Sequence, residues 1–276
     1  MKNCCSLASL VAAIVVSQAA SAAVVDFNSG TLDDAFDLTS AGNWSQQAAG
    51  GLNDSGSLLP ANDAFSYLVA DTQSFTGASI SFELSAFFQW ASPTNASGAN
   101  ALVLSLVPTT TGPLDLPLNS GDAGEDSLRV LLSKQNSSPN AANDVVSLVI
   151  ENQIDGVLAD TLDRVVSSDA ALTDGDWYRL SMSVTRTGTN FNVDASLDNA
   201  DDTGTVGSNV LSLNLTDRPN ADLASDPDLY AALGGQRSPV RGVGVIDDFS
   251  ASAVIPEPGS MGLLGAGALF LCARRR

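Results

Sequence analysis

The chain has 276 residues, of which 31 are acidic and 12 are basic, and its formal net charge is −19 at pH 7. It contains no histidine, which excludes Ser-His-Asp and Cys-His catalytic systems, histidine metal ligands and a histidine pH switch. Because so acidic a chain is repelled by phosphate backbones, we expect no nucleic-acid partner.

The first 22 residues are predicted to form a secretory signal peptide. Lys2 gives a positively charged start, an apolar run follows over 7–16, and Ala20-Ser21-Ala22 is a small-x-small cleavage site. The apolar run is shorter than the roughly 20 residues that cross a bilayer as a helix. We therefore expect a signal helix that signal peptidase removes, with cleavage after Ala22 or, as the next choice, after Ala23.

The middle of the chain alternates apolar and polar residues with a period of two, which is typical of half-buried β-strands. The alternation is clearest over 79–88, 178–185 and 191–198, and the Gly-containing connector 187–190 between the last two indicates a hairpin. Further strands are expected at 24–28, 65–70, 101–107, 128–133, 145–151, 211–215 and 243–250. Only 221–234 offers helical material, and Pro227 interrupts it. Without a dividing linker or an internal repeat, these strands predict one antiparallel sandwich over 23–253.

Three segments of this region resemble one fold family. Residues 173–180 contain Gly175-Asp176-Trp177 and then Leu180, which is similar to the Gly-x-Trp-x-x-Leu strand entry of the laminin-G/concanavalin A-like jelly roll. Residues 243–249 resemble the closing strand of that superfamily, and 25–30 resemble an opening strand. The resemblance implies an all-β antiparallel jelly-roll sandwich, with a galactose-binding-like sandwich as the neighbouring alternative.

The last residues form a three-part tail. Pro256-Glu257-Pro258 precedes an apolar run over 261–272, and a basic cluster of Arg274, Arg275 and Arg276 ends the chain. As a helix the run would extend about 18 Å, which is too short for a comfortable membrane span, and the arginines would remain cytoplasmic. An ordinary weak anchor helix is one interpretation.

The tail over 254–276 strongly resembles the PEP-CTERM sorting signal of exported proteins in exopolysaccharide-producing Gram-negative bacteria. That resemblance implies a short C-terminal hydrophobic helix that enters the inner membrane transiently and is read by an exosortase. It also implies delivery to the cell surface or the extracellular matrix.

The positions of the cysteines and the charges characterise the mature body, which is the sandwich region that remains when the signal peptide and the tail are removed. Cys4 and Cys5 lie in the signal peptide and Cys272 lies in the tail, so the body contains no cysteine and no disulfide. Its eight basic and 30 acidic residues give a formal charge near −22. Divalent cations or high salt would relieve the resulting repulsion.

Carboxylates are the only acid–base catalysts that the composition leaves. The glutamates of the body are Glu83, Glu125 and Glu151, and none lies in the Glu-x-Asp-x-(x)-Glu pattern that similar hydrolases carry on one strand. Glu83 falls on the polar face of its strand, where we expect it to be solvated. We therefore predict a protein that is not an enzyme, with a polysaccharide hydrolase or lyase as the less favoured alternative.

Asp247 shares a strand face with Val245 and Phe249, so we expect its carboxylate to lean toward the core. A buried carboxylate needs backbone amides, an arginine such as Arg241, or Ca²⁺. If the first and last strands pair, four oxygen-bearing side chains are candidate ligands of a structural Ca²⁺: Asp26, Asn28, Asp247 and Asp248. A hydrogen-bonded structural aspartate is the alternative, and no other cofactor is predicted.

Aromatic side chains that could stack on sugars are Trp44, Tyr67, Trp90 and Trp177. Trp90 follows the inward parity of its strand and is expected in the core, and Trp177 is expected under a loop, whereas Phe87 falls on the polar face. Together the sequence predicts an exported, non-enzymatic surface or matrix protein for adhesion or matrix organisation, with extracellular polysaccharide as its candidate partner. A purely structural matrix protein is the alternative.

Overall fold

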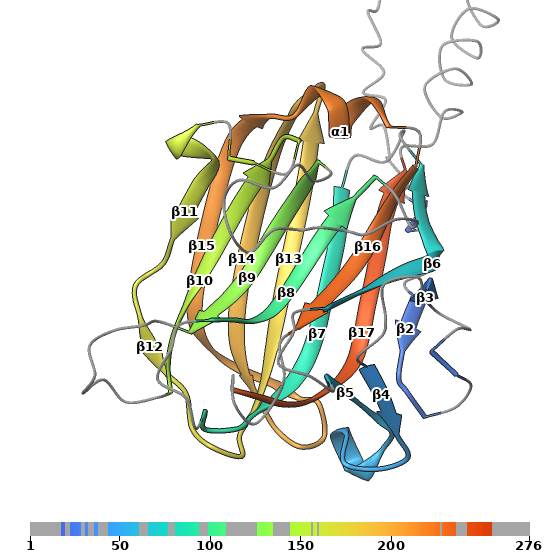
Figure 1. Cartoon of the computed structure of the whole chain (residues 1–276), viewed down its shortest axis with the longest axis vertical. Helices are drawn as coiled ribbons and strands as arrows, with labels where there is room; N and C mark the ends of the chain where they lie inside the picture. The colour runs from blue at the N-terminus through green and yellow to red at the C-terminus, as the bar shows by residue number, and fades with distance from the viewer. Residues whose placement is uncertain are drawn as a thin grey trace, which may run out of the picture.

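The structure is a computed structural model, and it describes residues 18–19, 23–28, 31–32, 36–37, 44–60, 66–76, 81–93, 99–108, 126–134, 144–155, 157–158, 160–226, 228–235 and 242–255. These residues form an antiparallel jelly-roll sandwich of two sheets, as the sequence predicts (Figure 1). The alternation of apolar and polar residues explains the sandwich, because each sheet buries one face against the other.

The first sheet has nine strands, and its main path runs β15-β14-β13-β7-β17-β5-β4. The strands of this path are β4 (Trp44–Gln47), β5 (Ser57–Pro60), β7 (Ser81–Trp90), β13 (Trp177–Thr187), β14 (Asn190–Ala200), β15 (Val206–Pro219) and β17 (Val243–Ile255). Two short strands, β1 (Gln18–Ala19) and β2 (Ala23–Val25), also pair with β17. The pairing of β2 with β17 brings the first and last predicted strands together.

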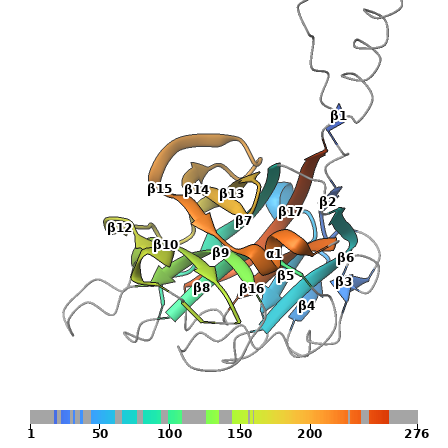
Figure 2. The ribbon, with the colours of Figure 1, turned by 90° about the horizontal axis from the view of Figure 1, so that it is seen from above.

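The second sheet has eight strands and follows the path β11-β10-β9-β8-β16-β6-β3. Its strands are β3 (Phe36–Asp37), β6 (Ser66–Thr76), β8 (Ala99–Val107), β9 (Ser127–Lys134), β10 (Val145–Gln153), β11 (Arg164–Val166) and β16 (Asp228–Gly235), while β12 (Ala170–Ala171) pairs with β10. In the view from above, the two sheets lie as two layers (Figure 2).

The core lies between the layers. Leu84 and Met182 on the first sheet and Leu104 and Leu148 on the second belong to one cluster of buried side chains. Removing such side chains from water contributes about 1.5–3 kcal/mol each, which makes this cluster the main stabilising element of a body without disulfides.

Three short helices connect strands in the part of the chain that the structure describes. A 3-10 helix η3 (Leu52–Asp54) lies between β4 and β5, a second, η4 (Thr161–Asp163), precedes β11, and α1 (Ala221–Ser225) precedes β16. The expectation of helical material over 221–234 is therefore wrong beyond Ser225, because 228–235 is a strand. Among the residues placed by the structure, no helix is both long and apolar enough to cross a membrane. The signal helix and the C-terminal hydrophobic helix fall outside the described residues.

The predicted strands of the middle region are confirmed, with ends that shift by up to six residues: 211–215 becomes β15 (Val206–Pro219) and 65–70 becomes β6 (Ser66–Thr76). The connector 187–190 is a tight hairpin turn, in which Gly188 has a φ of 64°. At the chain ends, Gln18 and Ala19 of β1 pair with Ile255 and Val254 of β17. The domain boundaries at residues 22 and 253 stay predictions.

Candidate functional site

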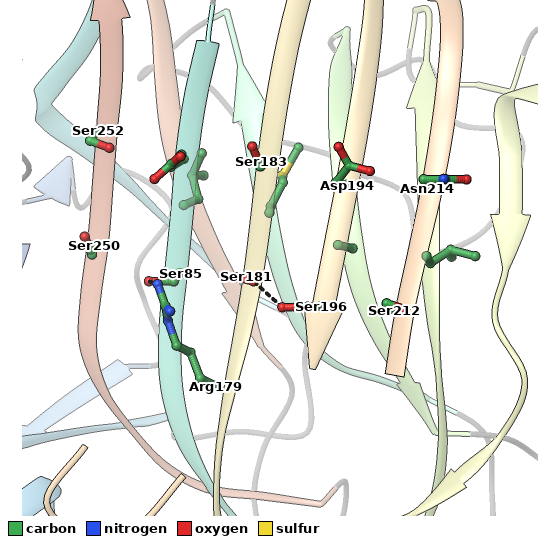
Figure 3. A pocket seen from close by; sticks show the side chains of 15 residues that line it. Ser85, Arg179, Ser181, Ser183, Asp194, Ser196, Ser212, Asn214, Ser250 and Ser252 are labelled. Carbon is green, nitrogen blue, oxygen red and sulfur yellow. Dashed lines mark hydrogen bonds between the residues drawn. The ribbon is translucent and has the colours of Figure 1, made fainter. Parts of the chain in front are cut away.

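Ten polar side chains form two parallel rows on the outer face of the first sheet. They come from β17, β7, β13, β14 and β15, and within each row neighbouring residues are paired in register. We call one row the carboxylate row: Ser252, Glu83, Ser183, Asp194 and Asn214. We call the other the serine row: Ser250, Ser85, Ser181, Ser196 and Ser212. Figure 3 shows how the labelled members of both rows cross the strands side by side.

The two rows line an open groove with a volume of about 760 Å³. Successive strands are separated by about 4.8 Å, so four inter-strand steps give each row a length of about 19 Å. Residues i and i+2 of a strand are about 7 Å apart, which is the spacing between the rows. Small serine side chains leave this face hollow, and the apolar residues between them, such as Leu84 and Met182, point into the core.

Hydroxyl groups of the serine row are linked in one direction. The Ser196 hydroxyl donates to Asp198 Oδ2 at 2.7 Å, and the Ser181 and Ser196 hydroxyls are 2.7 Å apart. A hydroxyl has one proton to donate, so Ser181 must donate to Ser196. Asn209 Nδ2 donates to the other Asp198 oxygen at 2.8 Å. Asp198 is therefore held by the sheet itself, while the lone pairs of Ser181 remain available to a ligand.

Arg179 is the cation that lines the groove. Its Nη2 donates to Ser85 Oγ at 3.2 Å, and its guanidinium carbon lies 5.9 Å from the centre of the Phe87 ring. Arg179 Nε is buried and has no hydrogen-bond partner among the described residues. The Arg179 guanidinium therefore lies beside a half-buried aromatic ring, and its Nε is shielded from solvent.

Glu83 and Asp194 are the carboxylates of the carboxylate row. Both are exposed, and both are paired in register with Ser183, which lies between them on β13. Within the part of the chain that the structure describes, neither forms a hydrogen bond or an ion pair. The sequence-based expectation that Glu83 is solvated is confirmed, but the presence of Asp194 in the same row was not predicted.

The other glutamates take no part in this site. Glu151 forms ion pairs with Arg129 at 2.8 Å and with Arg164 at 3.2 Å on the second sheet, and Glu125 lies outside the described residues.

The tryptophans do not line the groove. Trp44 is 9% exposed, Trp90 is fully buried and Trp177 is 6% exposed, so the core position predicted for Trp90 is confirmed and Trp177 is buried as well. The Trp90 indole N–H donates to Asp144 Oδ1 at 2.9 Å, which satisfies its polar atom. Nothing is described for the Tyr67 side chain. Recognition at this groove must therefore rest on polar groups, with Phe87 as the neighbouring ring.

Asp247 forms a second polar centre, inside the fold. Its carboxylate is fully buried and accepts from the Leu52 N–H at 2.8 Å, the Ser55 hydroxyl at 2.7 Å and the Asp248 N–H at 2.8 Å. The Gly51 backbone approaches so closely that a Cβ atom there would overlap Asp247 Oδ2. Asp247 is in register with the outward Phe87 while Ile246 faces the core, so the predicted lean toward the core is wrong, and the segment around η3 buries the carboxylate instead. Backbone amides and a hydroxyl satisfy it, whereas Arg241 lies outside the described residues.

The acidic neighbours of Asp247 are close enough to influence it. Burial raises the pKa of the Asp247 carboxyl, while its three hydrogen-bond donors act in the opposite direction and Asp26 raises it further. Burial, and then the charges of Asp247 and Asp26, raise the pKa of Asp248. By contrast, the Asn28 N–H, which donates to Asp26 Oδ1 at 3.1 Å, lowers the pKa of Asp26. The fold thus brings the four predicted calcium ligands into one neighbourhood.

Their geometry fits hydrogen bonding better than a metal ion. Asn28 Oδ1 accepts from the Gly56 N–H at 2.6 Å, and both oxygens of Asp247 are occupied by donors. In the described ranges, no group of three or more acidic or cysteine side chains is arranged to hold a metal ion. Ca²⁺ requires six to eight oxygens, and the side-chain oxygens of Asp247 and Asn28 already accept from N–H and O–H donors. The calcium site stays a prediction, and no mechanism is built on it.

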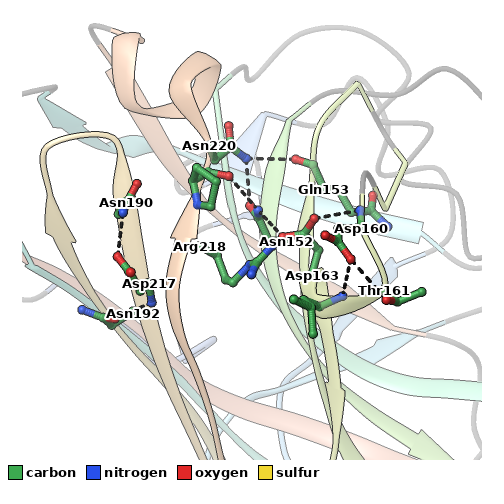
Figure 4. A network of polar contacts seen from close by, with 12 residues as sticks. Asn152, Gln153, Asp160, Thr161, Asp163, Asn190, Asn192, Asp217, Arg218 and Asn220 are labelled. Atoms are coloured by element: carbon green, nitrogen blue, oxygen red, sulfur yellow. Dashed lines mark hydrogen bonds and ion pairs between the residues drawn. The ribbon is translucent and has the colours of Figure 1, made fainter.

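A third polar cluster lies where β10, β15, η4 and α1 meet (Figure 4). Asn152 Nδ2 donates to Asp163 Oδ1 at 3.0 Å, and Asn220 Nδ2 donates to Asn152 Oδ1 at 3.0 Å. Arg218 pairs with Asp163 at 3.0 Å, and the Asn220 side chain accepts from the Leu223 N–H at the start of α1. These groups satisfy one another, so the cluster joins elements of the fold.

The predicted processing residues are only partly placed. Ala23 is the first residue of β2, whereas Ala22 and the tail residues Pro256, Glu257, Pro258, Arg274, Arg275 and Arg276 lie outside the described residues.

Comparison with known families finds one match, the PEP-CTERM protein-sorting motif, over residues 254–276. This signal indicates an exported, cell-surface protein of a Gram-negative bacterium, which the sequence analysis also infers. No curated protein matches the chain.

Among solved structures, the Lotus tetragonolobus seed lectin is 12% identical with a TM-score of 0.49, covering 79% of this chain and 95% of the lectin. Lectin I-B4 from Griffonia simplicifolia is 11% identical with a TM-score of 0.48 over 84% and 99% of the two chains. Peanut lectin is 11% identical with a TM-score of 0.47 over 85% and 98%. Similarity at this level carries no information about what the present chain binds.

Proposed function

We propose that this protein is an exported, non-enzymatic surface or matrix protein that binds an extracellular polysaccharide along the groove of the first sheet. A signal peptide over 1–22 and a sorting tail over 254–276 would flank the sandwich body over 23–253. Signal peptidase and an exosortase would be its processing partners, with transient insertion of the tail in the inner membrane. Adhesion to the matrix, or its organisation, would be the biological result.

The two polar rows are the observation that carries this proposal. Sugar hydroxyls both donate and accept hydrogen bonds, and the rows present hydroxyls, carboxylates, an amide and the Arg179 guanidinium on one hollow surface. The step between neighbouring strands, about 4.8 Å, is close to the length of one pyranose unit in an extended glycan. A linear chain laid across the strands would therefore place roughly one sugar unit over each of the five strands.

The exposure of the two carboxylates in the groove favours glycan binding over glycan hydrolysis. The general acid of a glycosidase is usually held in a desolvated site that keeps it protonated near neutral pH. Glu83 and Asp194 are instead exposed.

A hydrolase remains the second candidate because these two carboxylates share one row. Their Cα atoms are two inter-strand steps apart, which is about 10 Å, and inverting glycosidases hold their carboxyl groups about 6.5–9.5 Å apart. Polysaccharide turnover that is lost in Glu83→Gln would establish this second function.

Binding should be measured by calorimetry with native exopolysaccharide and with linear oligosaccharides of increasing length. We expect affinity to rise with length until about five units are present and then to level off. Ser181→Leu places a bulky side chain in the groove and should weaken binding at least tenfold, whereas Ser168→Leu, at an exposed position on the loop after β11, should leave it unchanged.

If no polysaccharide binds, the purely structural matrix protein is the correct interpretation. If binding occurs but both leucine variants behave like the parent protein, the ligand binds elsewhere and the groove assignment is wrong.

A further inference from the structure

The charges that face the groove are distributed unevenly. At one end, Arg179 and Asp198 are paired in register on β13 and β14, so their charges offset each other. At the other end, Glu83 and Asp194 contribute two negative charges without a cation among the described residues of that row. The Arg179 guanidinium reaches Ser85, which lies about 7 Å from Glu83 along β7, and among the described residues it forms no ion pair with Glu83 or Asp194. The Glu83 end therefore keeps an excess of negative charge.

Three acceptor side chains lie next to one another across the three central strands of the carboxylate row. Glu83, Ser183 and Asp194 come from the adjacent strands β7, β13 and β14, with Ser183 between the two carboxylates. A primary ammonium group has three N–H donors, and carboxylates accept charge-assisted hydrogen bonds from such donors. A cation above Ser183 would therefore be within reach of both negative side chains and of one hydroxyl.

The rest of the groove argues for a sugar that carries this ammonium. The serine row runs parallel to the carboxylate row at a spacing of about 7 Å and presents hydroxyl groups over its whole length. Ser85 in this row is only 5% exposed, and its hydroxyl is oriented by Arg179. A simple cation would use the carboxylate row and leave the serine row without a role. An amino sugar uses both, because its hydroxyls can bind the serines.

Acidic polysaccharides fit this surface poorly. A uronate carboxylate near Glu83 or Asp194 would meet like charge, and the net charge of −19 adds long-range repulsion.

We propose that the groove selects linear glycans with free amino groups, and that an ammonium group is bound between Glu83 and Asp194 above Ser183. This inference rests on the proposed function, because it assumes that the groove binds glycan. It adds the chemical class of the ligand.

The test uses the purified full chain and three five-unit probes: a glucosamine pentamer, an N-acetylglucosamine pentamer and a galacturonate pentamer. Calorimetry at low and high salt gives their affinities. The glucosamine pentamer should bind at least about tenfold more tightly than its acetylated counterpart, and the galacturonate pentamer should bind weakest. The preference for glucosamine should shrink at high salt, because exposed charge pairs are screened.

Variants locate the charge effect. Glu83→Gln and Asp194→Asn should each weaken glucosamine binding by about threefold to fivefold and weaken N-acetylglucosamine binding distinctly less. The matched control Asp169→Asn removes an exposed carboxylate on the loop between β11 and β12 and should change neither. Unfolding curves of all three variants should superimpose on the parent curve, since these carboxylates have no partners in the described structure.

Equal or tighter binding of the acetylated or the acidic pentamer would overturn the inference while leaving the proposed function intact. A lysine pentapeptide that binds as tightly as the glucosamine pentamer would overturn it too, because charge alone would then explain binding. If none of the three pentamers and no native exopolysaccharide binds, the proposed function itself fails.

Discussion

Replacing Asp247 tests whether hydrogen bonds hold the buried centre between β17 and the segment around η3. In Asp247→Ala, the Leu52 N–H, the Ser55 hydroxyl and the Asp248 N–H lose their common acceptor. Each buried donor left without a partner costs about 1–3 kcal/mol, and water entering the cavity recovers part of that cost. We therefore expect the free energy of unfolding to fall by about 3–5 kcal/mol.

Urea unfolding at neutral pH, followed by tryptophan fluorescence, measures this change. For a slope of about 3 kcal/mol per molar urea, the midpoint should fall by about 1–1.7 M. Asp247→Asn keeps one carbonyl oxygen but presents an amide to donors, so its cost should be intermediate, at about 1–2 kcal/mol. The control Asp248→Asn removes a half-buried carboxylate that is close to Asp247 and Asp26, and it should be neutral or slightly stabilising.

A loss below about 1 kcal/mol in Asp247→Ala would refute this reasoning, because three buried donors cannot lose a shared acceptor so cheaply. A larger loss in Asp247→Asn than in Asp247→Ala would also contradict it, since the asparagine retains an acceptor that alanine lacks.

Three further predictions follow from the same structure. Burial raises the pKa of four aspartates, so the folded chain binds more protons than the unfolded chain above the ordinary value of 3.8, and stability should rise as the pH falls from about 7.5 to about 5 at constant ionic strength. These residues are Asp126, Asp226, Asp247 and Asp248; a urea midpoint that falls over this pH range would contradict the prediction. EGTA should leave the thermal midpoint unchanged, because hydrogen bonds already satisfy Asp247, and a clear drop would support the calcium hypothesis instead. Gly242→Ala should cost about 3 kcal/mol or more in urea unfolding, because Gly242 has a φ of 103° and a Cβ atom there would overlap the Trp90 indole. Gly175→Ala, at a φ of 83° with open space around it, should cost only about 1–2 kcal/mol, and equal losses in both variants would show that the overlap is relieved elsewhere.

Local alternation predicted the outward side chains of the groove but not the groove itself. The periods of two over 79–88, 178–185 and 191–198 already assign Glu83, Ser183 and Asp194 to polar faces. The hairpin turn at Gly188 even fixes the register that places Ser183 opposite Asp194. The sequence does not reveal that β7 lies between β13 and β17, because these two pairings join residues about 90–100 and about 150–170 positions apart.

Strand β16 shows a second limit of prediction from the alternation of apolar and polar residues. Its inward Ala231 and Leu233 belong to the core, and its outward Ala232 belongs to a second buried cluster on the other face of the same sheet. A strand buried on both faces shows no alternation, and an alanine-rich apolar run is as typical of a helix. Parity predicted that Asp247 leans toward the core with Val245 and Phe249, but Ile246 takes the core position and Asp247 is in register with the outward Phe87. Asp247 is buried instead by the segment around Leu52, almost 200 residues away, which supplies two of its three donors.

The sorting motif and the proposed binding surface meet on one strand. β17 contributes Ser250 and Ser252 to the two rows and ends at Ile255, where the matched motif over 254–276 has just begun. Val254 is paired with Ser81, two residues along the strands beyond the pair of Ser252 with Glu83. The end of β17 therefore lies next to the carboxylate row, at the more negative end of the groove. If the tail holds the protein at the membrane before processing, that end is the one nearest to the anchor, and a long matrix chain could approach the groove across the strands, from the β15 side.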